Sequence, residues 1–94
     1  MGTAERLLNL IDTAPMTGVE FGRLRLEIGA ILGERGGDGK IVGRYGGCTQ
    51  GDLAAVLNRT ISNINKYENG KISIPGELAT LLRLIRRVIS PTRT

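Results

Sequence analysis

The spacing of hydrophobic and polar residues along the chain predicts helices. Apolar residues recur every three or four positions over residues 4–13, 17–35 and 76–89, which is the period of a helix that is buried along one side. Two shorter helical segments are expected after Thr49 and after Thr60. No apolar run approaches the roughly 18–20 residues of a membrane span. The chain is therefore expected to be all-α and not to enter a membrane.

The N-terminal segment, residues 1–16, is expected to form one extra helix, which Thr3 is positioned to cap. The main domain is expected over residues 17–89. It opens with Thr17 and Glu20, which have the spacing of a capping box, where each side chain bonds the other residue's free backbone N–H group.

Glycine is concentrated in residues 33–47, where it holds seven of fifteen positions. This stretch is expected to end the long helix and to form either a loop or a small hairpin that turns at Asp38-Gly39. It lacks the glycine spacing and the Ser or Thr of a phosphate-binding P-loop. Its cations Lys40 and Arg44 are expected at a DNA backbone, and the alternative is a merely soluble insertion.

Residues 48–70 have the pattern of two short helices joined by a tight turn. Thr49 and Asp52 form the capping box of the first helix. Asn58 ends it, because Asn accepts a left-handed backbone more readily than most residues. Thr60 caps the second helix only two residues later. This arrangement is the physical description of a helix-turn-helix.

The outward face of the second helix carries groups suited to reading base edges in the major groove of DNA. It offers hydrogen-bond donors, an acceptor and a surface for thymine methyl groups. Such faces are often only solvated, but the tight turn before this helix favours DNA reading. The expected base contacts are Ile61, Ser62, Asn65 and Lys66.

The same segment resembles the helix-turn-helix domains of the Xre, Cro and phage-repressor family. The residues that carry the resemblance keep the family's spacing without a gap: Thr49-Gln50, Leu53-Ala54, Leu57-Asn58, Thr60, Ile64, Tyr67-Glu68-Asn69-Gly70-Lys71 and Pro75. The resemblance covers residues 24–89. It implies a compact bundle of five to six helices, with 24–36, 50–57 and 61–68 as the first, second and recognition helices.

The resemblance also implies roles for single residues. Glu68 is expected in a structural ion pair, and Ile61, Ser62 and Lys66 are expected to face bases. Phosphate contacts are implied for Gln50, Asn69 and Lys71, and the neighbouring Thr49 and Arg59 are expected to share in them.

This chain departs from the family pattern in three places. The insertion, at about 36–47, separates the first two family helices, which normally follow each other almost directly. The arginine expected to pair with Glu68 falls at Gly33, so that the partner is either missing or displaced to Arg35. Arg59 occupies a turn position that is usually apolar.

Charge is distributed unevenly along the chain. Residues 1–38 carry four Arg and six acidic residues, a net charge of −2, whereas residues 39–94 carry nine Lys and Arg and three acidic residues, a net charge of +6. The two halves give the net charge of +4. A basic half suits a polyanion, because each neutralised phosphate releases counterions.

Residue types that carry much enzyme chemistry are scarce. The chain has no His and a single cysteine, Cys48, so it lacks the commonest general base, a Cys-based zinc site and an intramolecular disulfide. No enzymatic activity, metal or cofactor is expected. Cys48 is expected to be a small buried hydrophobic residue of a cytoplasmic protein.

The last helix carries more large aliphatic residues than one side of a helix in so small a domain needs to bury. The surplus predicts a homodimer, whose two-fold symmetry would match a palindromic operator. The expected interface residues are Leu82, Ile85, Val88 and Ile89. Residues 90–94 are expected to be a flexible tail.

These patterns predict a sequence-specific regulator of transcription that binds double-stranded DNA, most simply a dimeric repressor in the cytoplasm. Two alternatives stay open. One is an antitoxin that represses its own operon and binds a toxin protein through the N-terminal helix. The other is a protein-interaction module of the same fold.

Overall fold

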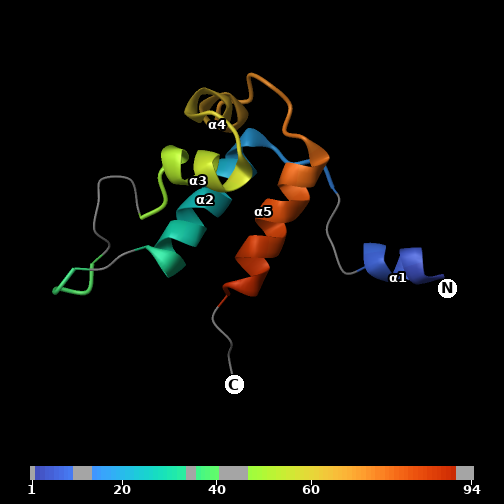
Figure 1. Ribbon diagram of the computed structural model, residues 1–94, viewed down its shortest axis with the longest axis horizontal. Coiled ribbons are helices and arrows are strands. Elements are labelled where there is room, and N and C mark those ends of the chain that lie inside the picture. The colour runs from blue at the N-terminus through green and yellow to red at the C-terminus, as the bar shows by residue number, and fades with distance from the viewer. Residues whose placement is uncertain (1, 10–13, 34–35, 41–46, 91–94) are drawn as a thin grey trace.

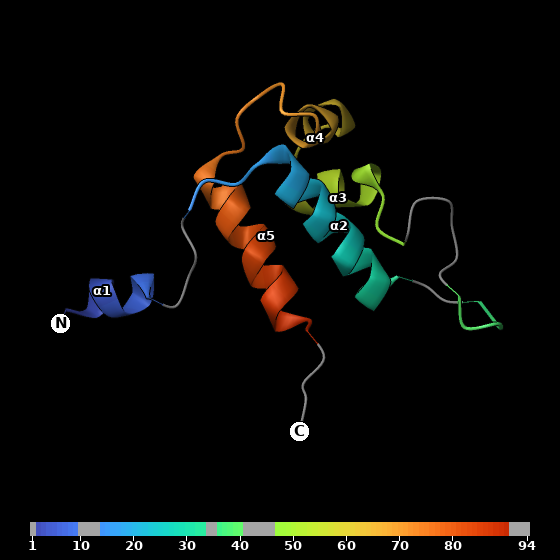
Figure 2. The ribbon, with the colours of Figure 1, turned by 180° about the vertical axis from the view of Figure 1, so that it is seen from behind.

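The computed structural model describes residues 2–9, 14–33, 36–40 and 47–90 (Figures 1 and 2). Over these residues it holds five helices and no strand, which confirms the expected all-α class. The helices are α1 (Thr3–Leu8), α2 (Gly18–Leu32), α3 (Gln50–Leu57), α4 (Ile61–Glu68) and α5 (Gly76–Val88). None of them is both long and apolar enough to cross a bilayer.

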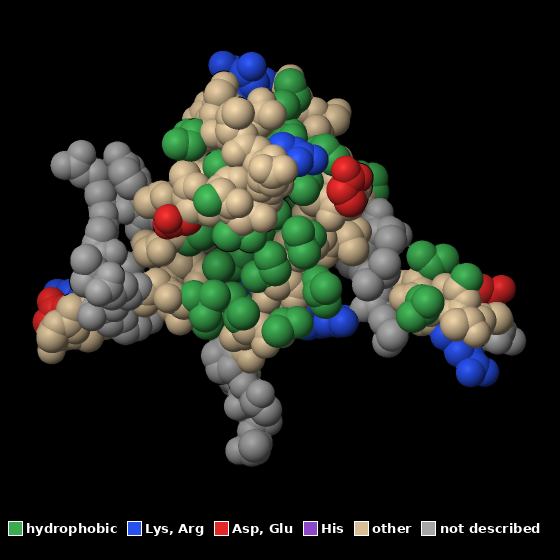
Figure 3. Space-filling view, in the orientation of Figure 1, with side chains coloured by type: hydrophobic (Ala, Val, Ile, Leu, Met, Phe, Trp, Pro, Cys, Tyr) green, Lys and Arg blue, Asp and Glu red, His purple; other side chains and the backbone are tan. Residues whose placement is uncertain are grey.

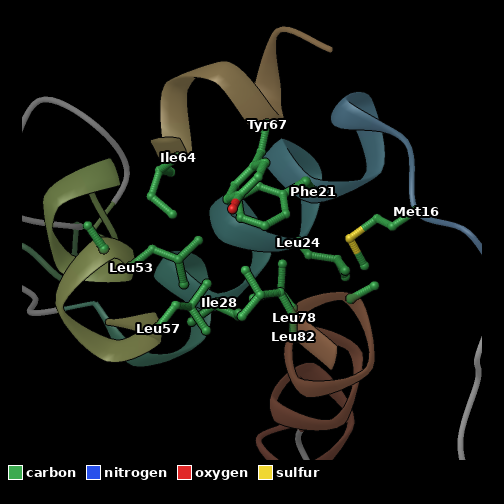
Figure 4. Packing of buried hydrophobic residues seen from close by; sticks show 12 residues of the cluster. Met16, Phe21, Leu24, Ile28, Leu53, Leu57, Ile64, Tyr67, Leu78 and Leu82 are labelled. Carbon is green, nitrogen blue, oxygen red and sulfur yellow. The ribbon is translucent and has the colours of Figure 1, made fainter. Parts of the chain in front are cut away.

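The four helices from α2 to α5 pack together around one core, with α2 between α4 and α5 and with α3 against α4 (Figure 1). Phe21, Ile64 and Leu82 are fully buried at its centre (Figure 4). The rings of Phe21 and Tyr67 lie 5.6 Å apart at 52°, a tilted arrangement that favours contact between a ring edge and a ring face. Each large side chain of this kind stabilises the fold by about 1.5–3 kcal/mol through burial.

Three threonines begin the helices that the sequence assigned to them. The hydroxyl groups of Thr17, Thr49 and Thr60 each accept a hydrogen bond from the backbone N–H three residues later, at 3.0–3.1 Å. Asp52 returns a bond of 2.9 Å to the Thr49 N–H, so the predicted capping box of α3 is confirmed. Asn58 has φ 54° and ψ 49°, the predicted left-handed end of α3. The predicted bounds of α3 and α4 are confirmed.

The N-terminal helix differs from its prediction. Thr3 is the first helical residue and Gly2 takes the cap position without a side-chain bond, so the assignment of Thr3 as a cap is wrong. The helix ends at Leu8, and residues 10–13, which were expected to extend it, lie outside the described residues. All six residues of α1 are exposed.

The long helix α2 ends at Leu32, before the predicted end near residue 35, and Gly33 is its C-cap. A tight turn follows at the predicted place. Gly39, with φ +78°, donates to the Gly36 carbonyl, and the Gly36 N–H donates to the Lys40 carbonyl. A three-residue hairpin loop of this kind ends with a residue of positive φ, and glycine adopts that backbone conformation without strain. Arg44 lies outside the described residues.

The aliphatic residues of α5 divide differently from the prediction. Leu82 is fully buried in the core of a single chain, so its assignment to a dimer interface is wrong. Ile85 and Ile89 are half-buried against the same core, and Val88 is exposed. Leu82 is buried because it lies on the side of α5 that packs against α2, whereas Val88 lies on a side of α5 that is exposed to solvent.

Candidate nucleic-acid interface

The outer face of α4 presents the four side chains that were expected to contact bases. Ile61, Ser62, Asn65 and Lys66 are all exposed, while Ile64 and Tyr67 of the same helix are buried. Positions 61, 62, 65 and 66 fall within less than half a turn of the helix surface. They form one continuous strip, which is called the α4 face below.

The α4 face continues onto the start of α3. A Cβ atom placed on Gly51 would lie 3.5 Å from Cδ1 of Ile61, in ordinary van der Waals contact. The side chain of Ile61 therefore lies over the first turn of α3. This contact joins an apolar surface, which suits a thymine methyl group, to a helix N-terminus, which suits a phosphate.

An ion pair fixes α4 against α2, and its arginine is not the one that the sequence predicted. Nε and Nη2 of Arg25 donate to the two carboxylate oxygens of Glu68 at 2.7 and 3.0 Å, and Nη1 donates to the Cys48 carbonyl at 2.7 Å. Glu68 therefore does have an arginine partner, and that partner is Arg25; Arg35, the alternative that the sequence suggested, lies outside the described residues. The two side chains are only 12% and 13% exposed. The hydrogen bond with Glu68 raises the pKa of the Arg25 guanidinium, which stays charged.

Arg25 lies within one turn of Gly22 on α2, and this spacing explains how the pair is accommodated. A Cβ atom on Gly22 would lie 3.4 Å from Oε1 of Glu68. The Glu68 carboxylate is therefore the close neighbour of Gly22. Arg25 and Glu68 are 43 positions apart, so no local sequence pattern pointed to this pair.

Gly18 holds the start of α2 against the end of α4. A Cβ atom there would lie 2.5 Å from the carbonyl oxygen of Tyr67 and 2.7 Å from that of Glu68. Only glycine allows this approach. The N-terminal dipole of α2 then faces carbonyl groups at the end of α4, an arrangement that is electrostatically favourable. Sequence reasoning did not single out Gly18.

A pocket of about 430 Å³ lies at the start of α3, lined by Arg25, Thr49, Gln50 and Gly51. The free N–H groups of the first turn of α3 belong to this end of the helix. The side-chain amide of Gln50 is bonded within the protein, since its Nε2 donates to Oε1 of Glu68 at 3.3 Å. The phosphate contacts of Thr49 and Gln50 remain predictions.

The other expected phosphate residues lie in different places. Lys71 is exposed, and its N–H donates to the Lys66 carbonyl, so it lies beside the end of the α4 face. Asn69 ties back onto α4, because its Nδ2 donates to the carbonyl and side-chain oxygens of Asn65 at 2.9 and 3.0 Å. Arg59 folds over its own turn and donates to the carbonyl groups of Leu57 and Asn58.

Lys40 does not join this surface. It lies in the turn that follows the C-terminal end of α2, whereas α4 packs near the N-terminal end of α2 (Figures 1 and 2). Cys48 precedes the cap of α3 and is half-buried against the core, as expected for a small hydrophobic residue. Burial raises the pKa of its thiol, which keeps the group protonated and unreactive near neutral pH.

Comparison of the chain with models of protein families, with curated proteins and with solved structures gave no match. The function is therefore inferred from the residues and their geometry.

Proposed function

We propose that this protein is a sequence-specific regulator of transcription that binds double-stranded DNA, with α3 and α4 as its helix-turn-helix and α4 as the recognition helix. The observation that carries the proposal is the α4 face. Four exposed side chains of different chemistry lie on one strip of a two-turn helix, and that helix is fixed from behind by the Arg25–Glu68 ion pair.

Each side chain of the α4 face has a suitable partner in the major groove. Lys66 can donate to O6 and N7 of guanine, and Ser62 can donate or accept. Asn65 has its side-chain oxygen engaged by Asn69, which leaves its NH₂ group to donate to an acceptor on a base. Ile61 can cover a thymine methyl group. The start of α3 and Lys71 would hold phosphates on either side and fix the register.

The regulatory action follows from occupancy. A dimer with two such faces binds a palindromic operator whose half-sites are about one helical turn, roughly 34 Å, apart. A bound dimer that overlaps a promoter excludes the polymerase, which makes the protein a repressor. Of the residues predicted for the dimer interface, Val88 and the half-buried Ile85 and Ile89 remain for contact with a second copy, and the exposed Leu81 and Leu84 of α5 add to them.

The direct experiment is selection of bound fragments from random duplex DNA. We expect an enriched palindrome. Recovery of no preferred sequence, together with binding to all duplexes, would contradict sequence-specific reading.

A pair of lysine variants separates reading from positioning. We expect Lys66→Ala to weaken binding to the selected operator by about 1–3 kcal/mol and to relax the preference at one position of each half-site. Lys71→Ala, the matched control, should weaken operator and scrambled duplex alike and reduce the slope of log K against log salt by about 1. Fluorescence anisotropy at two salt concentrations measures both. If Lys66→Ala weakened both duplexes equally, Lys66 would be a phosphate contact.

A further inference from the structure

An apolar groove of about 330 Å³ opens between α2, α3 and α5, on the flank of α5 that carries Ile85. Its exposed rim includes Leu32 and Val56, which are 62% and 65% exposed. Figure 3 shows hydrophobic side chains gathered over this side of the molecule. A continuous exposed apolar surface in a small protein marks an interaction site. Among the described residues that line the groove, Asp52 is the charged one.

The helix α1, in contrast, carries apolar side chains that no described element covers. Its six residues are all exposed, and Leu7 and Leu8 are 58% and 56% exposed. Helices shorter than about 12 residues are marginal in water without tertiary support. A docking surface for Leu7 and Leu8 would give α1 that support.

The chain directs α1 away from its own groove. Nη1 and Nη2 of Arg83 donate to the carbonyl groups of Ala14 and Pro15, at 2.5 and 3.4 Å, and hold the residues before α2 on one side of α5. Ile85, at the groove, follows Arg83 by two positions and so lies about 200° around the helix. The six Cα–Cα steps from Leu8 to Ala14 span at most about 22 Å when extended. Half the circumference of a helix about 11 Å wide takes about 17 Å of that span, so α1 could reach its own groove only with this segment stretched almost fully around α5, whereas α1 of a second copy can approach the groove directly.

We propose that the groove receives α1 of a second copy of this chain, and that two copies exchange these helices reciprocally. Leu7 and Leu8 enter the groove beside Val56, and Arg6 of α1 meets Asp52 at its edge. A closed two-fold pair contains this contact twice. The repetition doubles the area that a single docked helix would bury. The inference gives the proposed dimer its contact, and it is tested without DNA.

Analytical ultracentrifugation of the full chain and of three variants provides the test. We expect a dimer for the unaltered chain. Val56→Glu, in the groove, and Leu7→Glu, on α1, should each raise the dimer dissociation constant at least about 100-fold, because either change places a charge in an apolar contact. Val19→Glu is the matched control, since Val19 is 81% exposed and does not line the groove. This variant should remain dimeric. Urea unfolding of each variant checks that the monomer stays folded.

A mixture of the two disrupted variants distinguishes exchange of α1 from any other pairing. The Val56→Glu chain keeps an intact α1, and the Leu7→Glu chain keeps an intact groove, so the mixture should associate more tightly than either variant alone through the one remaining contact, although less tightly than the unaltered chain. A monomeric unaltered chain, a dimeric Leu7→Glu chain or a mixture that associates no more tightly than its components would each overturn the proposal. Binding of Val56→Glu to a single half-site is measured separately. Binding of the unaltered chain to duplex DNA is measured as well: a dimer that binds no duplex would contradict the DNA-binding function and leave the exchange of α1 standing.

Discussion

At the scale of single residues, the position of α4 is set by a few side chains behind it and not by the side chains that face outward. Arg25 connects three segments through Glu68, the Cys48 carbonyl and the bond that Gln50 makes to the same carboxylate. Charged groups with so little exposure are stable only when their hydrogen bonds are complete. The position of α4 therefore depends on one arginine of α2.

Replacing Arg25 should destabilise the protein more than breaking a comparable exposed pair. We expect Arg25→Ala to lower the free energy of unfolding by about 2–4 kcal/mol, because it leaves the Glu68 carboxylate half-buried without its partner. Arg86→Ala is the matched control. Nε of Arg86 lies 3.3 Å from Oε1 of Glu27, and the two side chains are 29% and 35% exposed. The loss in the free energy of unfolding should therefore stay below about 1 kcal/mol. Urea denaturation measures both free energies of unfolding. Equal losses would show that the Arg25–Glu68 pair stabilises the fold no more than the exposed Arg86–Glu27 pair.

Gly18 should tolerate no side chain. We expect Gly18→Ala to lower the free energy of unfolding by roughly 2–4 kcal/mol, because the new methyl group meets two backbone carbonyl oxygens that cannot move without displacing α4. Gly76→Ala, at the start of α5, has open space around the new Cβ atom and should be neutral or slightly stabilising. Thermal unfolding followed by circular dichroism compares the two, and an unaffected Gly18→Ala would contradict the close approach of α2 and α4.

At the scale of elements, the turn between α3 and α4 is set by local chemistry. Asn58 ends α3 in the left-handed region, and Thr60 begins α4 two residues later. The Arg59 N–H donates to the Ala54 carbonyl at 2.9 Å, which closes the last turn of α3. The crossing of the two helices therefore follows from three consecutive residues and the buried Ala54.

Two substitutions at one position test the turn. Asn58→Ala should lower the free energy of unfolding by about 1 kcal/mol, because a residue with a Cβ atom and no helpful side chain pays the full cost of a left-handed backbone. Asn58→Gly should leave stability within about 0.5 kcal/mol, because glycine adopts this conformation freely. Chemical denaturation of both variants measures their free energies of unfolding. A less stable glycine variant would assign the role to the Asn side chain rather than to φ.

At the scale of the whole molecule, Arg83 joins the N-terminal segment to the body of the fold. It donates to both carboxylate oxygens of Glu20 in α2, at 2.9 and 3.1 Å, and to the carbonyl groups of Ala14 and Pro15. It thereby couples α5, the start of α2 and the residues that lead to α1.

Removal of this arginine should loosen one segment more than the whole. We expect Arg83→Ala to lower the free energy of unfolding by about 1–3 kcal/mol and to speed proteolytic cleavage near residues 14–16, where the backbone loses its hydrogen-bond donors. Arg23→Ala, which removes one positive charge from an exposed position of α2, should change neither. Limited proteolysis with mass spectrometry locates the cuts, and unchanged cleavage near 14–16 would show that other contacts hold this segment.

The sequence by itself determined the features that rest on neighbouring residues. The helix periods, the caps at Thr17, Thr49 and Thr60 and the left-handed Asn58 follow from interactions within about four positions, so their signals are legible along the chain. The exposed α4 face also follows, because burying Ile64 and Tyr67 on one side leaves positions 61, 62, 65 and 66 on the other.

Only the tertiary structure decided which distant groups meet. Arg25 and Glu68 are 43 positions apart along the chain, and no local pattern selects Arg25 over Arg35. The burial of Leu82, the close approach at Gly18 and the uncovered groove beside Val56 depend on how α2, α3, α4 and α5 pack. Helical periodicity gives each helix an apolar side but does not say how much of that side its neighbours cover, and in this protein the uncovered part is where a second copy is proposed to bind.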